Sequence, residues 1–118
     1  MKAFLKNYRQ SPRKVRIIGN LLKGKTVPAA LSELQFLIKR GANPLSKIIK
    51  SAAANAKANN GIEAINLIVK NITVNKGMVL RRLEYKARGS ANVLHKRASN
   101  IEVVLDIKKE APKKRVTK

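Results

Sequence analysis

Two runs of alternating apolar residues frame the second half of the chain, with a long basic segment between them. In the first run, NLIVKNITVN, a period of two predicts that Ile68, Ile72 and Val74 share one inward face. The second run, IEVVLDI, alternates more regularly, with Glu102 and Asp106 outward and four apolar residues inward: Ile101, Val103, Leu105 and Ile107. Two such strands, joined through residues 76–100, restrict the fold to a sheet from which a long segment protrudes.

The segment between the two strands is predicted to form a β-hairpin with its turn at Gly89, where a positive φ is needed. Its arms, 78–87 and 91–100, would each reach about 33 Å, which is farther than a small core extends. Isolated hairpins are marginally stable in water, so we expect this one to be mobile alone and ordered inside a negatively charged groove. It carries one acid, Glu84, and seven cations: Lys76, Arg81, Arg82, Lys86, Arg88, Lys96 and Arg97.

Helical periodicity dominates the first half of the chain. Ser11-Pro12 predicts a helix start, with a capping hydroxyl and a proline at the first helical position, and Lys23-Gly24 predicts its end. The apolar stripe of this helix is Val15, Ile17, Ile18, Leu21 and Leu22. A second helix is predicted from Thr26 to Gly41, with Pro28 in its first turn. Its stripe is Val27, Leu31, Leu34 and Ile38.

A third helix is predicted to open at Asn43-Pro44 and to close at Asn59-Asn60-Gly61. Its stripe is the most regular in the chain: Leu45, Ile48, Ile49, Ala52, Ala53 and Ala56. A short strand over 2–9 is also expected. The fold class is therefore α+β, with three helices packed on a small antiparallel three-stranded sheet and a long protruding β-hairpin. Residues 1–107 form one domain in this interpretation, and 108–118 form a disordered basic tail.

The charge balance indicates the class of partner. The chain has 27 Lys and Arg residues against six acids, a formal net charge of +21, and both halves share the excess. Such a charge repels itself in a compact state, and a dense polyanion removes that repulsion. Nucleic acid is the leading candidate, and an anionic membrane surface is the second. The third helix is too rich in alanine on its apolar side to anchor in a membrane interface.

The same composition argues against catalysis and metal binding. The chain has no cysteine and a single histidine, His95, without a ligand partner at a metal-binding spacing. We therefore expect no enzyme activity, no cofactor, no metal and no small-molecule substrate. No apolar stretch approaches the roughly 20 residues that span a bilayer, so we expect a soluble, intracellular protein. Four aromatic residues without a cluster on one strand favour contacts to phosphate over base stacking: Phe4, Tyr8, Phe36 and Tyr85.

Three cations lie in the first turn of the first predicted helix: Arg13, Lys14 and Arg16. A helix N-terminus is already partly positive, so cations are unfavourable there unless an anion is bound nearby. A solvated helix start is the alternative interpretation. On the third helix, Lys47, Lys50 and Lys57 fit either a solvated face or an RNA contact.

Three separated motifs resemble a known family. They are SPRKVRIIGNLLKGK (11–25), KIIKSAAANAKANNG (47–61) and RRLEYKARGSANVLHKRASNI (81–101). Their order and spacing are similar to those of the bacterial form of the large-subunit ribosomal protein family designated twenty-two. The resemblance implies three helices on a small sheet with a protruding hairpin. It also implies binding to large-subunit ribosomal RNA, contact with neighbouring ribosomal proteins, and a hairpin that lines the exit tunnel of the nascent peptide.

The resemblance and the charge pattern together give the candidate site residues. We expect RNA contacts from the following set: Arg9, Ser11, Arg13, Lys14, Arg16, Lys76, Arg81, Arg82, Lys86, Arg88, Lys96 and Arg97. The tip of the hairpin in the tunnel is expected at Lys86, Ala87, Arg88, Gly89, Ser90 and Ala91. The alternative function is that of an architectural DNA-compacting protein, whose basic arms would enter a minor groove. The tip lacks the proline wedge that such arms use to unstack bases.

Overall fold

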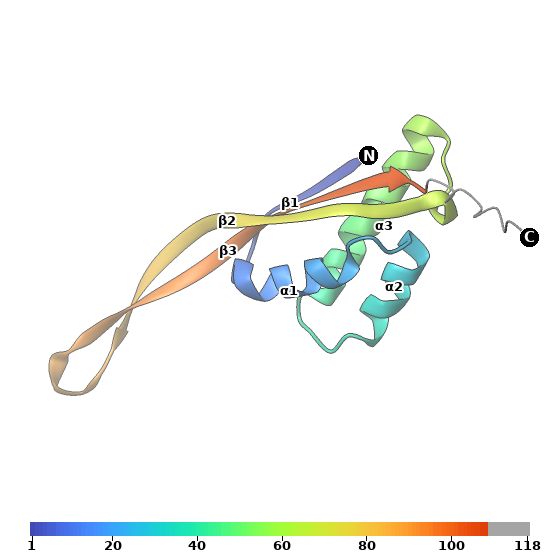
Figure 1. The fold of residues 1–118 in the computed structure, drawn as a ribbon. Helices are drawn as coiled ribbons and strands as arrows, with labels where there is room; N and C mark the ends of the chain where they lie inside the picture. The colour runs from blue at the N-terminus through green and yellow to red at the C-terminus, as the bar shows by residue number, and fades with distance from the viewer. Residues whose placement is uncertain (109–118) are drawn as a thin grey trace, which may run out of the picture.

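A computed structural model describes residues 1–108 and confirms the α+β class. Figure 1 shows a sheet with helices packed against it and a two-stranded ribbon that leaves the body at one end. The helices are α1 (Pro12–Leu22), α2 (Val27–Phe36) and α3 (Ala42–Asn60), and short 3-10 turns cover Ala64–Asn66 and Ala87–Gly89. The strands are β1 (Lys2–Tyr8), β2 (Leu67–Tyr85) and β3 (Ala91–Ile107). The predicted tail lies outside the described residues, except for Lys108.

The sheet is antiparallel with the order β1-β3-β2, so the last strand of the chain is the central one. Ala3 lies opposite Val103 in one ladder, and Val74 lies opposite Ile101 in the other. The predicted first strand, 2–9, is thereby confirmed within one residue. Helix α1 packs against β2, α3 packs against β1 and β3, and α2 packs against α3.

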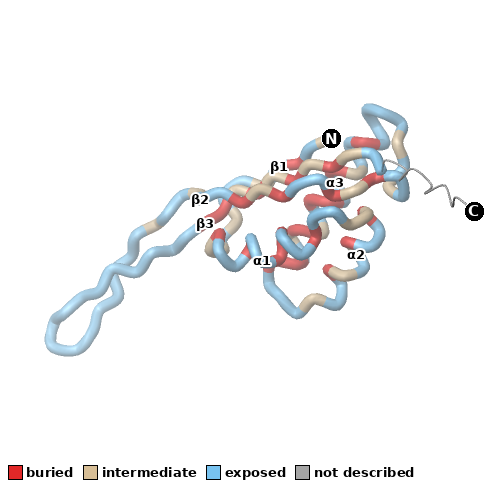
Figure 2. Tube along the Cα trace, in the orientation of Figure 1, coloured by how far each residue is buried: buried red, intermediate tan, exposed pale blue. Residues whose placement is uncertain are grey.

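The core lies between the sheet and the helices (Figure 2). In β3 the predicted inward residues Ile101, Val103 and Leu105 are buried, but Ile107 is half exposed because it lies at the end of the strand. In α3 the predicted stripe is buried, with Ala53 at its edge. The alanines of this stripe permit close approach to the sheet, as the α3 contacts with β1 and β3 require.

The predicted inward face of β2 is wrong at its start. Leu67 and Val69 are the buried residues there, and Ile68 is only partly buried. The register shifts between Val69 and Asn71, so Lys70 is an extra residue on this strand. Such a bulge reverses the alternation, which is why Ile72 and Val74 are inward as predicted.

Helix α1 has the predicted bounds but a narrower buried face. Ile17 is 68% exposed, and Leu21 is also exposed, because Val15, Ile18 and Leu22 are the members of the predicted stripe that face the core. Ser11 occupies the N-cap position without the predicted side-chain hydrogen bond. Its backbone carbonyl oxygen instead accepts the first hydrogen bonds of the helix.

Gly41 has a different role from the predicted one. Helix α2 ends at Phe36, Leu37 is extended, and Ile38 is 96% exposed, so the predicted end at Gly41 is wrong. Gly41 is the N-cap of α3, and Asn43-Pro44 lies in the first turn rather than at the cap. A Cβ at Gly41 would lie 2.9 Å from Cδ1 of Ile18, so the glycine permits close packing between the start of α3 and α1. The glycine is therefore required by its contact with α1, and it does not mark the end of α2 as predicted.

The hairpin protrudes as predicted. The extents of the molecule are 80 × 36 × 22 Å and its radius of gyration is 19.0 Å, against about 13–14 Å for a compact chain of this length. Gly89 has the positive φ expected at the turn, +71°, and the preceding residue, Arg88, also has a positive φ, +58°. The ladder reaches the pair Tyr85 and Ala91, so the first arm ends two residues earlier than predicted and the second begins where predicted. Residues 81–97 are exposed without exception (Figure 2).

Candidate nucleic-acid interface

The hairpin leaves the body at an irregular point in the sheet. The pairing of β2 with β3 shifts between Lys76 and Val79, and Gly77 lies within that bulge. A Cβ at Gly77 would lie 3.1 Å from Oδ1 of Asn7 and 3.2 Å from the carbonyl carbon of Ala98. The missing side chain therefore lets three segments of chain meet at the hairpin root.

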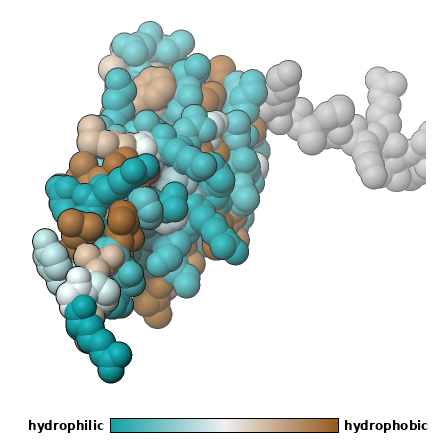
Figure 3. Space-filling model, turned by 90° about the vertical axis from the view of Figure 1, so that its left-hand side faces the viewer, coloured by the Kyte–Doolittle hydropathy of each residue, from teal (hydrophilic) through white to brown (hydrophobic). Residues whose placement is uncertain are grey.

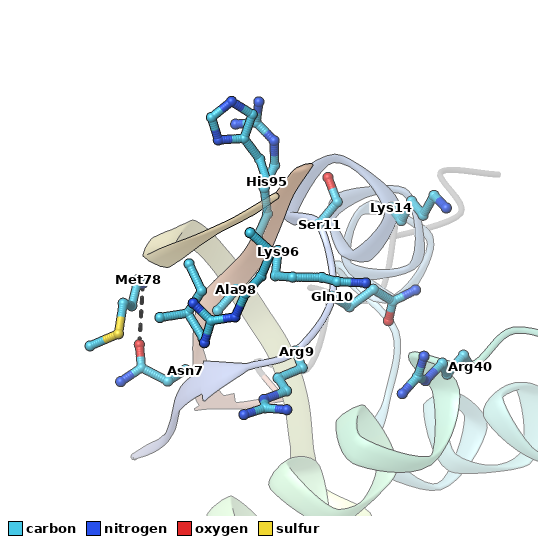
Figure 4. Close-up of a pocket in the computed structure, with 13 residues that line it drawn as sticks. Asn7, Arg9, Gln10, Ser11, Lys14, Arg40, Met78, His95, Lys96 and Ala98 are labelled. Carbon is cyan, nitrogen blue, oxygen red and sulfur yellow. Dashed lines mark hydrogen bonds between the residues drawn. The ribbon is translucent and has the colours of Figure 1, made fainter. Parts of the chain in front are cut away.

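Asn7 connects the first strand to this root. It has a φ of +53°, a left-handed conformation that asparagine tolerates better than most residues. Its backbone N–H donates to Oδ1 of Asn100 at 2.8 Å. Its own Oδ1 accepts a longer hydrogen bond, 3.4 Å, from the backbone N–H of Met78 (Figure 4). Asn7 thus contacts both arms of the hairpin at the point where they leave the core.

A groove of about 850 Å³, here called the root groove, lies beside this junction. Five parts of the chain form its walls: the end of β1, the connection from β1 to α1, the first turn of α1, the connection from α2 to α3, and the hairpin with both its arms (Figure 4). The lining residues are Asn7, Arg9, Gln10, Ser11, Lys14, Arg40, Met78, Leu80, Arg82, His95, Lys96, Arg97 and Ala98.

The root groove is strongly positive. All thirteen lining residues lie within residues 1–108; six of them are cations and none is an acid. The cations are Arg9, Lys14, Arg40, Arg82, Lys96 and Arg97. The ion pairs recorded among residues 1–108 lie elsewhere, at Lys2–Glu102, Lys25–Glu33, Lys70–Asp106 and Lys86–Glu84. The groove can therefore bind an anion without displacing a protein carboxylate.

The structure brings together half of the predicted RNA-contact residues in the root groove. These are Arg9, Ser11, Lys14, Arg82, Lys96 and Arg97. The other half is distributed along the surface. Lys76 lies at the bulge, Arg81 lies opposite His95 on the hairpin, and Arg13 is exposed on the first turn of α1. Lys86 and Arg88 lie at the tip.

Arg16 has a structural contact that the sequence did not indicate. Its Nε donates a hydrogen bond of 3.0 Å to the carbonyl oxygen of Val74. This contact joins α1 to β2 across 58 residues of sequence. The guanidinium has further donors for an anion, but one of them is already committed to the fold.

The predicted tip is a compact exposed turn. The backbone N–H of Lys86 donates to the carbonyl oxygen of Ser90 at 2.8 Å, and the Ser90 hydroxyl donates to the carbonyl oxygen of Ala87 at 2.9 Å. Two cations, Lys86 and Arg88, are therefore displayed on a turn whose backbone hydrogen bonds are local. No group of three or more potential metal ligands occurs among residues 1–108. None of the helices in the same residues is long and apolar enough to cross a membrane.

Seven of the thirteen residues that line the root groove were not predicted as RNA contacts, and two of these seven, Arg40 and His95, have ionisable side chains. Arg40 lies between α2 and α3, far along the chain from the other cations, and only the tertiary fold brings it to them. His95 was considered only as a metal ligand or catalytic residue, yet it lines the groove beside Lys96. The sequence signal for His95 was its place within a basic hairpin arm.

The hairpin also exposes apolar side chains between its cations. In Figure 3, viewed from the hairpin end, brown apolar atoms lie among teal hydrophilic ones. The exposed large apolar residues of the hairpin are Met78, Val79, Leu83, Tyr85, Val93 and Leu94. The ribbon beyond the root is therefore amphipathic, and no other described element covers it.

Comparison with known proteins decides the family. Residues 3–106 match the family model described as "Ribosomal protein L22p/L17e". The chain belongs to the L22p/L17e family of ribosomal proteins. The match covers all three motifs from which the resemblance was inferred, so that prediction is confirmed.

Curated relatives in the L22p/L17e family agree over nearly the whole chain. A large ribosomal subunit protein uL22 from Herpetosiphon aurantiacus is 44% identical over 105 residues, covering 89% of this chain and 93% of the relative. The uL22 of Neorickettsia sennetsu is 41% identical over 107 residues, covering 91% and 95% respectively. That of Desulfitobacterium hafniense is 44% identical over 109 residues, covering 92% and 96%. Membership of a ribosomal protein family implies a structural rather than an enzymatic role.

Proposed function

We propose that this protein is a cytoplasmic constituent of the large ribosomal subunit that binds and stabilises large-subunit ribosomal RNA. It catalyses no reaction and needs no cofactor. Family membership supports this role, and the observation that carries the RNA contact is the root groove. Its six cations, gathered from separate elements without an accompanying acid, match a folded polyanion better than a small ligand.

The body and the hairpin have different parts in this proposal. The body presents Arg13, Lys14 and other cations around the sheet and helices, where RNA segments from several directions can be neutralised at once. The hairpin carries Arg81, Arg82, Lys86 and Arg88 away from the core, and in this proposal they contact the RNA. Neighbouring ribosomal proteins are further partners on surfaces that RNA leaves open.

We propose further that the hairpin tip, Lys86 to Ala91, lines the exit tunnel and meets the nascent peptide. An extended ribbon of 7 or more paired residues per arm beyond the root can cross a layer of RNA that a compact domain cannot. Exposed apolar residues such as Leu83 and Val93 offer contacts to a passing peptide that lysines and arginines alone do not.

Binding of purified large-subunit ribosomal RNA over a range of salt concentrations tests the RNA contact. About eight phosphate contacts would give a log–log slope on the order of −6 to −7. A slope near −1 would contradict the proposal. Duplex DNA as a competitor tests the alternative of a DNA-compacting protein, and equal competition by DNA and ribosomal RNA would favour that alternative.

Cross-linking in translating ribosomes tests the tunnel contact. The chain has no cysteine, so Ser90→Cys places a single reactive thiol at the tip. We expect this variant, incorporated into ribosomes, to cross-link to nascent chains. Ser51→Cys, on the exposed side of α3, is the matched control and should not. Equal labelling of nascent chains from both positions would contradict the placement of the hairpin.

A further inference from the structure

We propose that the root groove binds a stretch of RNA backbone and that this contact fixes the direction of the hairpin relative to the body. The inference rests on the proposed function, because it takes RNA as the polyanion. It adds a specific binding site, two residues that sequence analysis did not assign to RNA, Arg40 and His95, and a mechanical consequence of binding.

The first step is the origin of the cations. Arg9, Lys14 and Arg40 belong to the body, whereas Arg82, Lys96 and Arg97 belong to the hairpin arms. Figure 4 shows side chains from both parts around the same space. A phosphate chain lying in the groove therefore contacts the body and the hairpin at the same time. Binding there must couple their relative positions.

The second step is the weakness of the protein's own connection at the root. The strand ladder is interrupted between Lys76 and Val79, and beyond it the arms pair only with each other. The side-chain contacts recorded there are those of Asn7, at 2.8 Å to Asn100 and 3.4 Å to Met78. A two-stranded ribbon without a covering layer is marginal in water. Its direction is thus held by few interactions.

The third step is electrostatic. Six cations around one groove repel each other, and this repulsion favours conformations in which the hairpin swings away from the body. Phosphates between them reverse the sign of the interaction and favour closure. The free protein should therefore sample several hairpin directions, and the RNA-bound protein should sample one.

The lining chemistry indicates backbone rather than bases. Arginine guanidinium groups at Arg9, Arg40 and Arg97 match the geometry of phosphate oxygens. Among the thirteen lining residues, all within residues 1–108, His95 carries the one aromatic ring on which a base could stack, against six cations that suit phosphate. The volume of about 850 Å³ lies in the upper part of the range of ligand sites, ~300–1,000 Å³. The site should therefore tolerate different RNA sequences.

A distance measurement between two spin labels tests the coupling. The labels go on Asn92→Cys in the hairpin and Ala54→Cys on α3, both exposed positions outside the groove in a chain without native cysteine. We expect a broad distance distribution in the free full-length protein. Addition of purified large-subunit ribosomal RNA should narrow it to one population.

Two charge-matched variants separate the groove from general charge. The groove variant is Arg9→Gln, Arg40→Gln and Lys96→Gln, and the control variant is Lys23→Gln, Lys50→Gln and Lys57→Gln. With RNA, the groove variant should keep a broad distribution of distances between the two labels. The slope of its log affinity against log salt concentration should be less steep by about 2 to 3. The control should keep the narrowing. Unfolding curves check that each is folded, and the single change Arg40→Gln replaces the triple if it is not.

The outcomes are distinguishable. RNA binding with equal narrowing in the groove and control variants would overturn the groove proposal and leave the proposed function standing. A narrow distribution in the free protein would overturn the coupling. No RNA binding by the unmodified protein would overturn both.

Discussion

The Nε of Arg16 donates a hydrogen bond of 3.0 Å to the carbonyl oxygen of Val74, and so joins the first helix to the long second strand. Gly19, on the same helix, permits the close approach that this contact needs, because a Cβ there would lie 3.2 Å from Ile72. A cation near a helix N-terminus thereby gains a partner within the protein. Arg13, one turn earlier, is exposed and makes no such hydrogen bond within the described residues.

Replacing Arg16 should therefore destabilise the protein without RNA. We expect Arg16→Ala to lower the free energy of unfolding by about 1–2 kcal/mol, since it removes a charge-assisted hydrogen bond to a backbone carbonyl. Arg13→Ala should change that free energy by less than about 0.5 kcal/mol. Urea denaturation followed by circular dichroism measures both. Equal effects would show that the Arg16–Val74 contact adds nothing to stability.

Adding a methyl group at the hairpin root should disturb three segments at once. In Gly77→Ala the new Cβ would lie 3.1–3.3 Å from Asn7 and from the backbone of Ala98, so the strands must move apart. We expect a loss of about 1–3 kcal/mol of stability. Amide chemical shifts should change at Asn7 and Ala98 and remain unchanged in α2. An unperturbed spectrum would contradict the close approach.

Ser99 should tolerate the loss of its hydroxyl. It is fully buried, and its Oγ has no hydrogen-bond partner among the described residues. An unpaired buried hydroxyl is unfavourable, so Ser99→Ala should leave stability unchanged or raise it by about 1 kcal/mol. A loss of more than about 1 kcal/mol in Ser99→Ala would contradict this prediction and would indicate that the Ser99 hydroxyl is hydrogen-bonded to a buried water.

The body should fold without the hairpin. Val79 lies opposite Arg97, so residues 80–96 can be replaced by Asn-Gly, the preferred two-residue hairpin turn. The core residues remain, because the buried set of the sheet ends at Val74 and resumes at Ala98. We expect the midpoint of thermal unfolding to be unchanged. The slope of log affinity for ribosomal RNA against log salt concentration should be less steep by up to about 4, because five cations are removed. Loss of folding would show that the hairpin stabilises the body.

Local signals in the sequence predicted most elements because they depend on near neighbours. The stripe of α3, the alternation of β3 and the glycine at the hairpin turn each follow from residues within a few positions of one another. The bulge at Lys70 was missed because its extra residue is visible only from the partner strand. The role of Gly41 was missed because it depends on Ile18, which lies on another helix.

Half of the predicted RNA-contact residues line the root groove, but the sequence did not indicate that they would meet there. Composition and motif resemblance identified Arg9, Lys14, Arg82, Lys96 and Arg97, since a cation on an exposed segment is recognisable from sequence. Their meeting in one groove depends on the fold that places the β1–α1 connection beside the hairpin arms. Arg40 had no local signal at all. Its role follows from proximity across the fold.

The strand order has a consequence for the biosynthesis of the protein itself. Lys2 pairs with Val104, and the terminal amino group of Met1 donates to the carbonyl oxygen of Leu105. Strand β1 is translated before α1, α2, α3 and β2, and it has no partner strand until β3 has also been made. Since β3 lies between β1 and β2, the sheet closes by insertion at its centre. Such long-range pairing slows folding, and an early-made N-terminal segment must stay soluble on its own until then.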